Sequence, residues 1–217
     1  MTYCLALRLD DGLVFLADTR TNAGVDNVSS YRKLHTFEPA PDRVFVIESA
    51  GNLASTQQVL DRTYQDLANP DSESLATVRT DGTSTCILGG QIAGERPDIL
   101  LIYPQGNYIR ASDDRPFLQI GETKYGKLML ELAVKGRVDI EDASTIALSS
   151  MISTARANLS VGPPYDLAIY RNGSLELDQG RIETGSPLLA ELEERWTALL
   201  LTAVSELPRV RPADLVG

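Results

Sequence analysis

The strand-like segments of this sequence arrive in consecutive pairs joined by short turns, and this order limits its fold more than any other feature. Asp10-Asp11-Gly12 and Asn172-Gly173 are both favoured hairpin turns, and each lies between two apolar runs. Strands joined in this way pair antiparallel, which argues against a doubly wound parallel sheet. The predicted strands cover residues 3–9, 13–17, 33–38, 43–48, 83–89, 98–103, 107–111, 117–120, 166–171 and 174–178.

Helical segments lie between the groups of strands, in blocks. Apolar residues recur in them at helical spacing, and Asn52 or Ser49 is predicted to cap the first helix. Ser186 followed by Pro187 is typical of a helix start and predicts the last one. The predicted helices cover residues 53–68, 123–135, 140–158 and 187–206. The order of strands, helix, strands, two helices, strands and helix predicts a layered α+β sandwich.

The composition limits the class of protein and its partners. The 217 residues fit one large domain, predicted over residues 1–206, with 207–217 as a loose tail. The net charge of -10 argues against nucleic acid and membrane surfaces as partners. Cys4 and Cys86 lie in apolar runs and are predicted to be buried free thiols. Since no basic leader precedes the first strand and no apolar run reaches the roughly 20 residues of a membrane span, we expect a cytoplasmic protein.

The single histidine, His35, removes most of the common catalytic arrangements. It lies in a strand-like run with no serine or cysteine beside it, which argues against a Ser-His-Asp or Cys-His site. Several histidines or a cysteine cluster for a metal are absent from the sequence, as is a phosphate-binding glycine loop, so neither a metal nor a cofactor is expected. One chemistry needs none of these groups: an N-terminal threonine attacks a carbonyl and uses its own α-amine as the base.

Thr2 becomes such a threonine when the initiator Met1 is removed. The α-amine, with an ordinary pKa of about 7.7–8.0, suits a general base at neutral pH if a cation tunes it and an acid orients that cation. If the first turn is Asp11-Gly12 or Asp10-Asp11-Gly12, paired positions add up to about 22 or 23, so residue 2 faces residues 20 and 21. Asp18 is then one diagonal step away, and Lys33 begins the next strand. Taken singly, each has a simpler interpretation: a chance second residue, a strand end and a solvated charge.

Three segments resemble the proteasome β-type subunits, which are N-terminal nucleophile (Ntn) hydrolases. "ADTRTNAG" resembles their D-S-R-x-T-x-G segment, and "YRKL" resembles the segment with their active-site lysine. "SAGNLASTQ" resembles the S-G-x-x-A-D-x-Q stretch that opens their first helix. Among these proteins, the N-terminus is most similar to that of the bacterial proteasome homologues called Anbu. The resemblance covers about residues 2–205 and is most specific in the first 60.

The resemblance implies a four-layer αββα Ntn-hydrolase sandwich of two antiparallel sheets between helix layers. It also implies Thr2 as nucleophile and base, Lys33 as the cation that tunes the amine, and Asp18 as the residue that orients Lys33. Gly51 would supply the N–H of an oxyanion hole. The remaining substrate-binding positions are Thr21, for backbone hydrogen bonds to an extended peptide, and Ser49 and Leu53, near a side-chain pocket.

Two segments depart from the family pattern where it supports the α-amine. "QIGETKYG" has Glu122 or Thr123 where the family has a serine, and a carboxylate there would raise the pKa of the amine. "NLSVG" has Asn158 where the family has an aspartate, with Ser160 one position away from the expected serine. These four residues are the candidates for amine support.

Three functions remain open. The first is a threonine peptidase or amidohydrolase that acts on peptides or proteins through an acyl-enzyme, inside a homo-oligomeric ring or spiral. The second is a largely non-proteolytic, self-assembling structural component, and a third is an Ntn amidohydrolase for a small amide. The sequence leaves the natural substrate and an ATPase partner undetermined.

Overall fold

The computed structural model describes residues 1–22, 28–68, 84–133, 138–211 and 214. The chain divides into two compact units, Met1–Thr184 and Gly185–Gly217, which are described separately. The first unit holds all the strands of the described residues, in two five-stranded sheets and one short hairpin. The second unit holds one long helix, α4 (Pro187–Glu206), capped by the Ser186 side chain as predicted.

The first sheet carries the N-terminal strand at its centre. Its strand order is β10-β1-β2-β11-β12, and every neighbouring pair is antiparallel. Its strands are β1 (Tyr3–Arg8), β2 (Gly12–Asp18), β10 (Phe117–Gly121), β11 (Tyr165–Arg171) and β12 (Leu177–Ile182). All seven residues of β2 are buried, as expected of a central strand covered on both faces.

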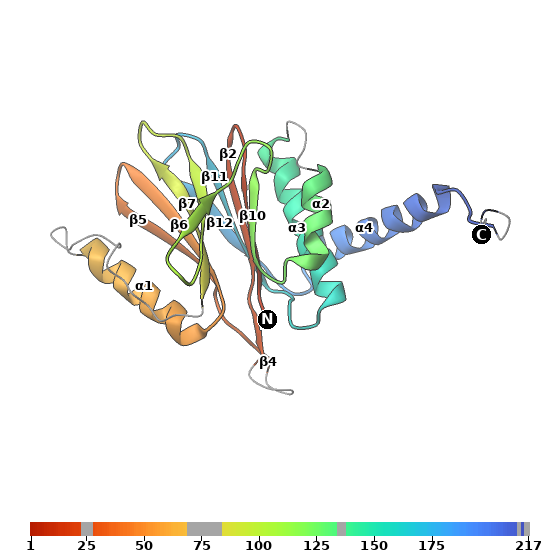
Figure 1. The fold of residues 1–217 in the computed structure, drawn as a ribbon, viewed down its shortest axis with the longest axis horizontal. Helices are drawn as coiled ribbons and strands as arrows, with labels where there is room; N and C mark the ends of the chain where they lie inside the picture. Colours follow the sequence, from red (N-terminus) through yellow and green to blue (C-terminus); the bar gives the residue numbers. More distant parts are fainter. Residues whose placement is uncertain (23–27, 69–83, 134–137, 212–213, 215–217) are drawn as a thin grey trace. The chain divides into compact units, whose positions relative to one another are not determined.

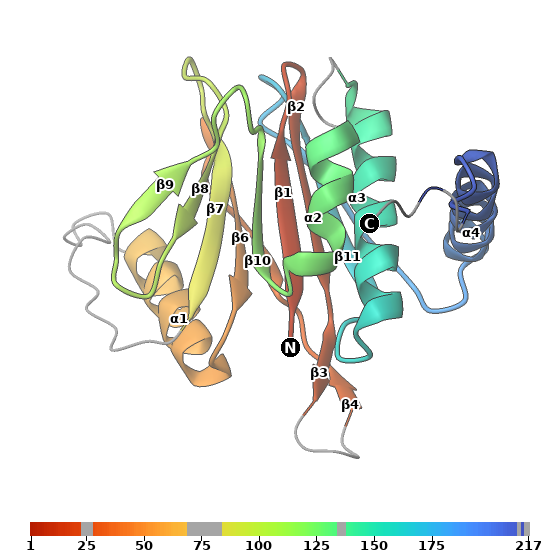
Figure 2. The ribbon, with the colours of Figure 1, turned by 45° about the vertical axis from the view of Figure 1, so that its right-hand side comes forward.

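The second sheet has the order β5-β6-β7-β8-β9 and is also fully antiparallel. Its strands are β5 (Leu34–Ala40), β6 (Arg43–Ala50), β7 (Thr85–Ile92), β8 (Asp98–Ile102) and β9 (Tyr108–Arg110). A separate hairpin of β3 (Arg20–Asn22) and β4 (Val28–Ser30) extends the chain beyond β2, at the end of the sandwich that bears the N-terminus (Figure 2).

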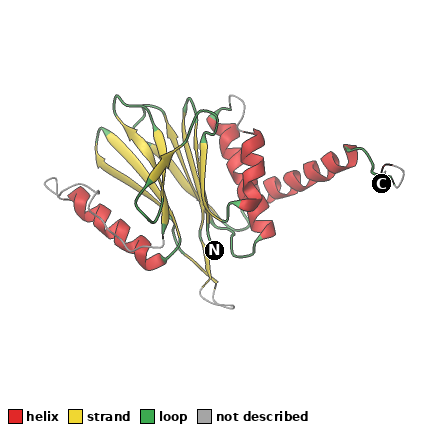
Figure 3. Cartoon of the chain, viewed as in Figure 1, coloured by secondary structure: helices red, strands yellow, loops and turns green. Residues whose placement is uncertain are grey.

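Helices cover the outer faces of both sheets. Helices α2 (Lys124–Ala133) and α3 (Ile140–Ala157) lie on the first sheet, and α1 (Leu53–Ala68) lies on the second (Figures 1 and 3). Leu60 of α1 packs on Phe37 and Ile47 of the second sheet. The first unit is therefore a four-layer αββα sandwich of two antiparallel sheets, which confirms the predicted fold class.

The main core lies between the two sheets. Alternate residues of β1, β2 and β6 point into it, including Cys4, Ala6 and Phe15 from the first sheet and Val44 and Val46 from the second. Helices α2 and α3 do not bury all their apolar side chains: Met151 of α3 is buried, whereas Leu128 of α2 is 65% exposed. Both cysteines are buried free thiols, as predicted.

The register of the first hairpin corrects the prediction. Cys4 pairs with Ala17 and Arg8 with Leu13, so paired positions add up to 21 and not to 22 or 23. The turn is displaced toward the N-terminus: the Leu9 N–H donates to the Gly12 carbonyl, so Leu9 and Gly12 flank a two-residue turn, Asp10-Asp11. As a result Asp18 lies opposite Tyr3 and does not stand a diagonal step from residue 2.

Two other local predictions were wrong. No strand was predicted over residues 20–22, within the "TRTNAG" segment, yet these residues form β3. The last hairpin does not close on a two-residue turn, since Tyr170 pairs with Leu177 and residues 172–176 form the loop. This loop is widened because it is held from outside: the Asn172 N–H donates to the Asp11 carbonyl, and the Gly173 N–H donates to Gln91.

Candidate active site

A buried ion pair lies beside the start of β1. The Lys33 Nζ donates to Asp18 Oδ1 at 2.8 Å, and the side chains are only 4% and 0% exposed. Lys33 also donates to the Arg20 carbonyl at 2.7 Å. The backbone N–H of Tyr3 donates to the same Asp18 oxygen at 2.9 Å. Because Tyr3 follows Thr2 directly, Asp18 ties Lys33 to the residue next to the predicted nucleophile.

Two opposing effects act on the pKa of Asp18. Burial raises the pKa of Asp18 above its ordinary value, while the Lys33 ammonium and the Tyr3 N–H lower it. A buried charge needs such a partner, because removal of one member leaves the other charge unpaired at a large cost in stability. Asp18 at the end of β2 and Lys33 ahead of β5 are therefore coupled both in position and in charge.

The backbone around Thr2 is fixed on both sides. Its carbonyl accepts the Glu122 N–H at 2.7 Å, which extends the pairing of β1 with β10 by one step. Gly121 has φ +83°, and a Cβ at this position would lie 1.9 Å from the Thr2 carbonyl oxygen. The next residue is held as well, since the buried Tyr3 hydroxyl bonds to Ser150 of α3 at 2.8 Å.

The predicted amine-support residues form a chain of contacts next to Thr2. Asn158 Nδ2 donates to Glu122 Oε2 at 3.0 Å and lies 3.8 Å from the Met1 sulfur. Asn158 Oδ1 in turn accepts the Ser160 N–H at 3.0 Å. Ser160 and Thr123 thus take part through their backbone N–H groups, the latter donating to the Gly121 carbonyl at 3.1 Å.

The predicted substrate-binding residues occupy the neighbouring strand ends. Ser49 is buried at the end of β6, and its N–H donates to the Lys33 carbonyl at 3.1 Å. Gly51 follows with φ +125° and is exposed, just before α1, whose first residue Leu53 is 41% exposed. Thr21 lies in β3. Within the described residues, no hydrogen bond joins Thr21, Gly51 or Leu53 to the Asp18–Lys33 pair.

The cap of α1 decides between the two predicted residues. Asn52 Oδ1 accepts the N–H groups of Ala54 and Ser55, at 2.8 and 3.3 Å, so Asn52 and not Ser49 caps the helix. Ser49 is therefore left free of a capping role.

Sequence reasoning missed two residues around this site. Arg20 offers its carbonyl to Lys33, and its guanidinium donates to the Leu159 carbonyl at 2.8 Å and fills the space that a side chain at Gly162 would need. Glu48 is fully buried in β6, where Val44, Val46 and Ala50 face the inter-sheet core. A glutamate at an inward position of an apolar strand was the signal available for Glu48; nothing in the sequence marked Arg20.

The described part of the chain brings no three His, Cys, Asp or Glu side chains together in a way that would hold a metal ion. None of its helices has the length and apolar character needed to cross a membrane.

The four-layer sandwich and its placement of the N-terminal strand are those of the proteasome β-type, Ntn-hydrolase class of proteins. Solved structures narrow this class. An Anbu mutant (Gly-1) from Hyphomicrobium sp. strain MC1 is 40% identical, with a TM-score of 0.90 over 97% of this chain and 100% of that one. Anbu from Yersinia bercovieri, described as an ancestral beta-subunit, is 38% identical, with a TM-score of 0.89 over 97% and 100%.

A third structure, the helical assembly of the Anbu complex from Pseudomonas aeruginosa, is 38% identical, with a TM-score of 0.90 over 98% of this chain and 99% of that one. The chain belongs to the Anbu family, which confirms the predicted resemblance. No protein-family model matches the sequence. No curated protein matches it either.

Proposed function

We propose that this protein is a threonine-type N-terminal nucleophile hydrolase that cleaves peptide bonds with Thr2 after loss of Met1. The observation that carries the proposal is the buried Lys33–Asp18 pair, which the Tyr3 N–H binds directly behind Thr2. Proteasome-related family membership supports the reaction class. The net charge of -10 is unfavourable for nucleic acids and anionic membranes, which agrees with a peptide or protein as the substrate.

The proposed reaction has two steps, acylation of Thr2 and hydrolysis of the resulting ester. The Thr2 amine takes the proton from its own hydroxyl as Oγ1 attacks the substrate carbonyl, and the Gly51 N–H stabilises the oxyanion. The same proton passes to the departing amine as the C–N bond breaks, which leaves an ester on Thr2. Water then adds to the ester carbonyl, gives one proton to the α-amine, and releases the acid as Oγ1 regains its proton.

Lys33 and Asp18 act on this chemistry through position and charge. A cation beside the α-amine disfavours the protonated amine and so keeps the base ready to accept a proton. Asp18 holds that cation in place. Glu122 acts in the opposite direction, because a carboxylate near the amine favours its charged form. Asn158 holds the Glu122 carboxylate by one hydrogen bond, and we expect activity to increase at mildly alkaline pH.

The test combines intact mass with an N-terminal threonine probe. The purified protein should lack the mass of Met1, and a peptide epoxyketone, which reacts with both the hydroxyl and the amine of an N-terminal threonine, should label Thr2. Thr2→Ala should abolish labelling. Retention of Met1 in the mature protein would refute the mechanism, because no free threonine amine would exist.

Lys33 needs a variant that keeps the fold intact. A single Lys33→Met change would leave Asp18 buried without its partner, so the double variant Asp18→Asn/Lys33→Met removes both charges together. A folded double variant that has lost Met1 should label at less than about a hundredth of the normal rate, the usual scale for loss of acid–base assistance. Equal labelling would show that the pair is only structural.

We also propose that the protein functions as a homo-oligomer. The related Pseudomonas aeruginosa structure is a helical assembly. In this chain, α4 exposes large apolar side chains along its second half, namely Leu199, Leu200, Leu201 and Val204. Exposed apolar surface of this kind marks an interaction site.

A further inference from the structure

A cavity of about 480 Å³ lies at the far end of β1 from Thr2. Arg8, the last residue of β1, lines it together with parts of β6, β7, β8 and the turn between β7 and β8. At about 3.3 Å per residue, the strand places Arg8 roughly 17 Å from Tyr3. The cavity is therefore separate from the candidate active site, and its volume falls in the range of about 300–1,000 Å³ that small-molecule sites occupy.

The lining combines apolar surface with an excess of positive charge. Phe45, Leu88 and Leu100 supply apolar side chains from three adjacent strands. The charged residues of the lining are three arginines, Arg8, Arg96 and Arg110, against two acids, Glu95 and Asp98. In a chain with a net charge of -10, this local excess of arginine favours an anionic ligand.

One wall of the cavity is held rigidly by hydrogen bonds. The buried Gln91 amide nitrogen donates to Asn172 Oδ1 at 3.2 Å and to the Glu95 carbonyl. The Gln91 carbonyl oxygen accepts from the Tyr170 hydroxyl and from the Gly173 N–H. Because these bonds are already formed, little free energy is lost in ordering this wall when a ligand binds.

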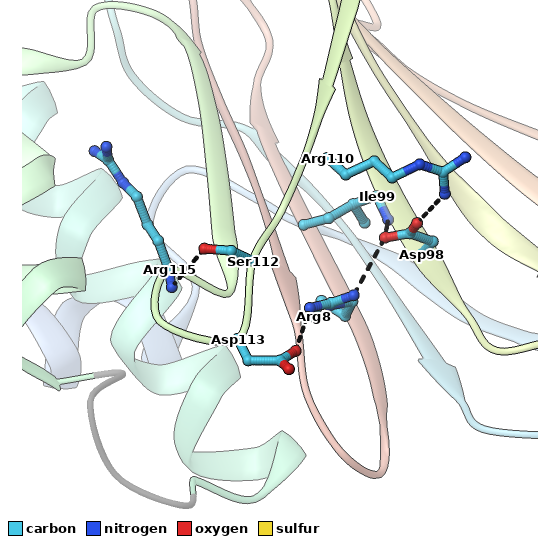
Figure 4. A network of polar contacts seen from close by, with 7 residues as sticks. All are labelled: Arg8, Asp98, Ile99, Arg110, Ser112, Asp113 and Arg115. Atoms are coloured by element: carbon cyan, nitrogen blue, oxygen red, sulfur yellow. Dashed lines mark hydrogen bonds and ion pairs between the residues drawn. The ribbon is translucent and has the colours of Figure 1, made fainter.

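Asp98 fixes two of the guanidinium groups. It accepts from Arg8 Nη1 at 3.5 Å, from the Ile99 N–H at 2.9 Å and from Arg110 Nη1 (Figure 4). The Arg8 side chain is only 17% exposed. Asp98 therefore works as a fixed internal acceptor that orients both arginines.

The second carboxylate on Arg8 is held much less firmly. Asp113 Oδ1 accepts from Arg8 Nη2 at 2.7 Å, yet the Asp113 side chain is 89% exposed. Figure 4 shows Arg8 between Asp98 on one side and Asp113 on the other. Ion pairs with so exposed a partner contribute little to stability, so a different carboxylate can replace Asp113 on Arg8 at small cost. Asp113 shows that Arg8 Nη2 is available to a carboxylate from outside the cavity wall.

We propose that this cavity binds a small amphipathic carboxylate, with its acid group on Arg8 in place of Asp113 and its apolar body against Phe45, Leu88 and Leu100. Guanidinium groups suit this role because their N–H donors match a carboxylate in two-pronged geometry. Arg110 has one nitrogen on Asp98, and Arg96 has no ion pair within the described residues, so both offer further donors to the acid group.

The first test uses the full-length protein and three probes in saturation-transfer NMR and calorimetry. The acid is 3-phenylpropionate, 3-phenylpropanol supplies the same apolar body without charge, and acetate supplies the head group alone. Both controls should bind about tenfold more weakly, or more, since each loses either a charge-assisted pair or the apolar contact. Equal affinity of acid and alcohol, or no binding of the acid, would overturn the proposal.

Three variants locate the site. Asp113→Asn should tighten 3-phenylpropionate binding several-fold, because it removes the internal competitor from an exposed position. Arg110→Ala should weaken binding, and Arg8→Lys should weaken it too, since lysine keeps the charge and loses the fork.

Arg115→Ala is the matched control. Arg115 belongs to the same surface network, points away from Arg8 in Figure 4, pairs with Glu131 at 3.3 Å and is not part of the lining. Its removal should leave affinity unchanged. If Asp113→Asn fails to tighten binding, or Arg115→Ala weakens it as much as Arg110→Ala does, the acid binds elsewhere and the proposal is wrong.

Discussion

Glu48 is a carboxyl group in the core, and no side chain of the described residues pairs with it as a counter-charge. It is 0% exposed, and neither of its oxygens has a hydrogen-bond partner within the described residues. Burial raises the pKa of Glu48 well above its ordinary value; the Leu16 N–H opposes this shift without reaching hydrogen-bond geometry. The folded protein therefore holds Glu48 as a neutral acid at pH values where the unfolded chain has released that proton.

This difference makes stability fall as pH rises. Below the ordinary glutamate pKa, both states bind the proton and Glu48 carries no penalty. Above it and up to the folded pKa, the equilibrium constant for folding falls about tenfold per pH unit on account of this one proton. Glu48→Gln should remove that slope, whatever its effect on absolute stability, in urea unfolding measured from pH 5 to pH 8.

Glu38→Gln on the neighbouring strand β5 is the control, because Glu38 is exposed. It should leave the pH slope as it is in the unchanged protein. A Glu48→Gln protein with an unaltered slope would mean that Glu48 is ionised in the fold.

Cys4 lies two residues after Thr2, and its buried environment makes its thiol unreactive. Burial raises the pKa of the Cys4 thiol well above its ordinary value, and raises that of Cys86 to about 11. Since the thiolate is the reactive form, we expect neither cysteine to react with iodoacetamide in the native protein at pH 8, and both to react in urea. Alkylation of native Cys4 would contradict this, and would also require N-terminal probe labelling to be assigned between Cys4 and Thr2 by peptide mass.

At the scale of elements, the junction of β1 and β10 positions Thr2. Gly121→Ala would place a methyl group 1.9 Å from the Thr2 carbonyl oxygen, at a residue with φ +83°. The backbone must then shift, so we expect epoxyketone labelling of Thr2 to fall by an order of magnitude or more, since small displacements of reacting groups are costly.

Gly173→Ala is a matched control for backbone strain. Gly173 has a similar φ of +80°, with nothing within 4 Å of the added Cβ. Both variants pay the left-handed strain of about 1–2 kcal/mol, visible in thermal unfolding. Only Gly121→Ala should lose labelling. Equal labelling of the two variants would show that Thr2 is not held by this contact.

The sequence predicted elements better than their pairing. Helix α4 begins and ends at the predicted residues, because Ser186 and Pro187 mark its start and the apolar run ends near Glu206. The first hairpin was predicted one to two positions out of register. Its turn is Asp10-Asp11, closed by the hydrogen bond from Leu9 to Gly12, and the sequence alone does not decide which residues of Asp10-Asp11-Gly12 form the turn. The last hairpin failed for a similar reason: its loop is shaped by Gln91, far away in sequence.

The candidate site was likewise predicted only in part. The proximity of Asp18 and Lys33 was predicted, and the ion pair between them is present at 2.8 Å. Arg20 could not be predicted, because it contributes a backbone carbonyl to Lys33, and any residue type carries one. The contact of Asn158 with Glu122 joins two segments that were noted separately for departing from the family pattern.

At the scale of the whole molecule, α4 exposes a group of apolar side chains that a second copy of the chain can cover. Its exposed residues include Leu199, Leu200, Leu201 and Val204, exposed by 62%, 45%, 68% and 67%. Leu200 and Val204 are four residues apart and share one face of the helix. If this face forms an interface between copies, two charges on it should break the assembly.

We expect Leu200→Glu/Val204→Glu to reduce the oligomer to smaller species in light scattering and mass photometry, with unchanged circular dichroism. Thr202→Glu is the control, since Thr202 is also exposed and lies on the other side of α4. An unchanged oligomer in the double variant would place the interface elsewhere. Labelling of Thr2 in the dissociated protein then separates two roles of assembly: retained labelling means that each chain carries a complete site, and lost labelling means that assembly completes it.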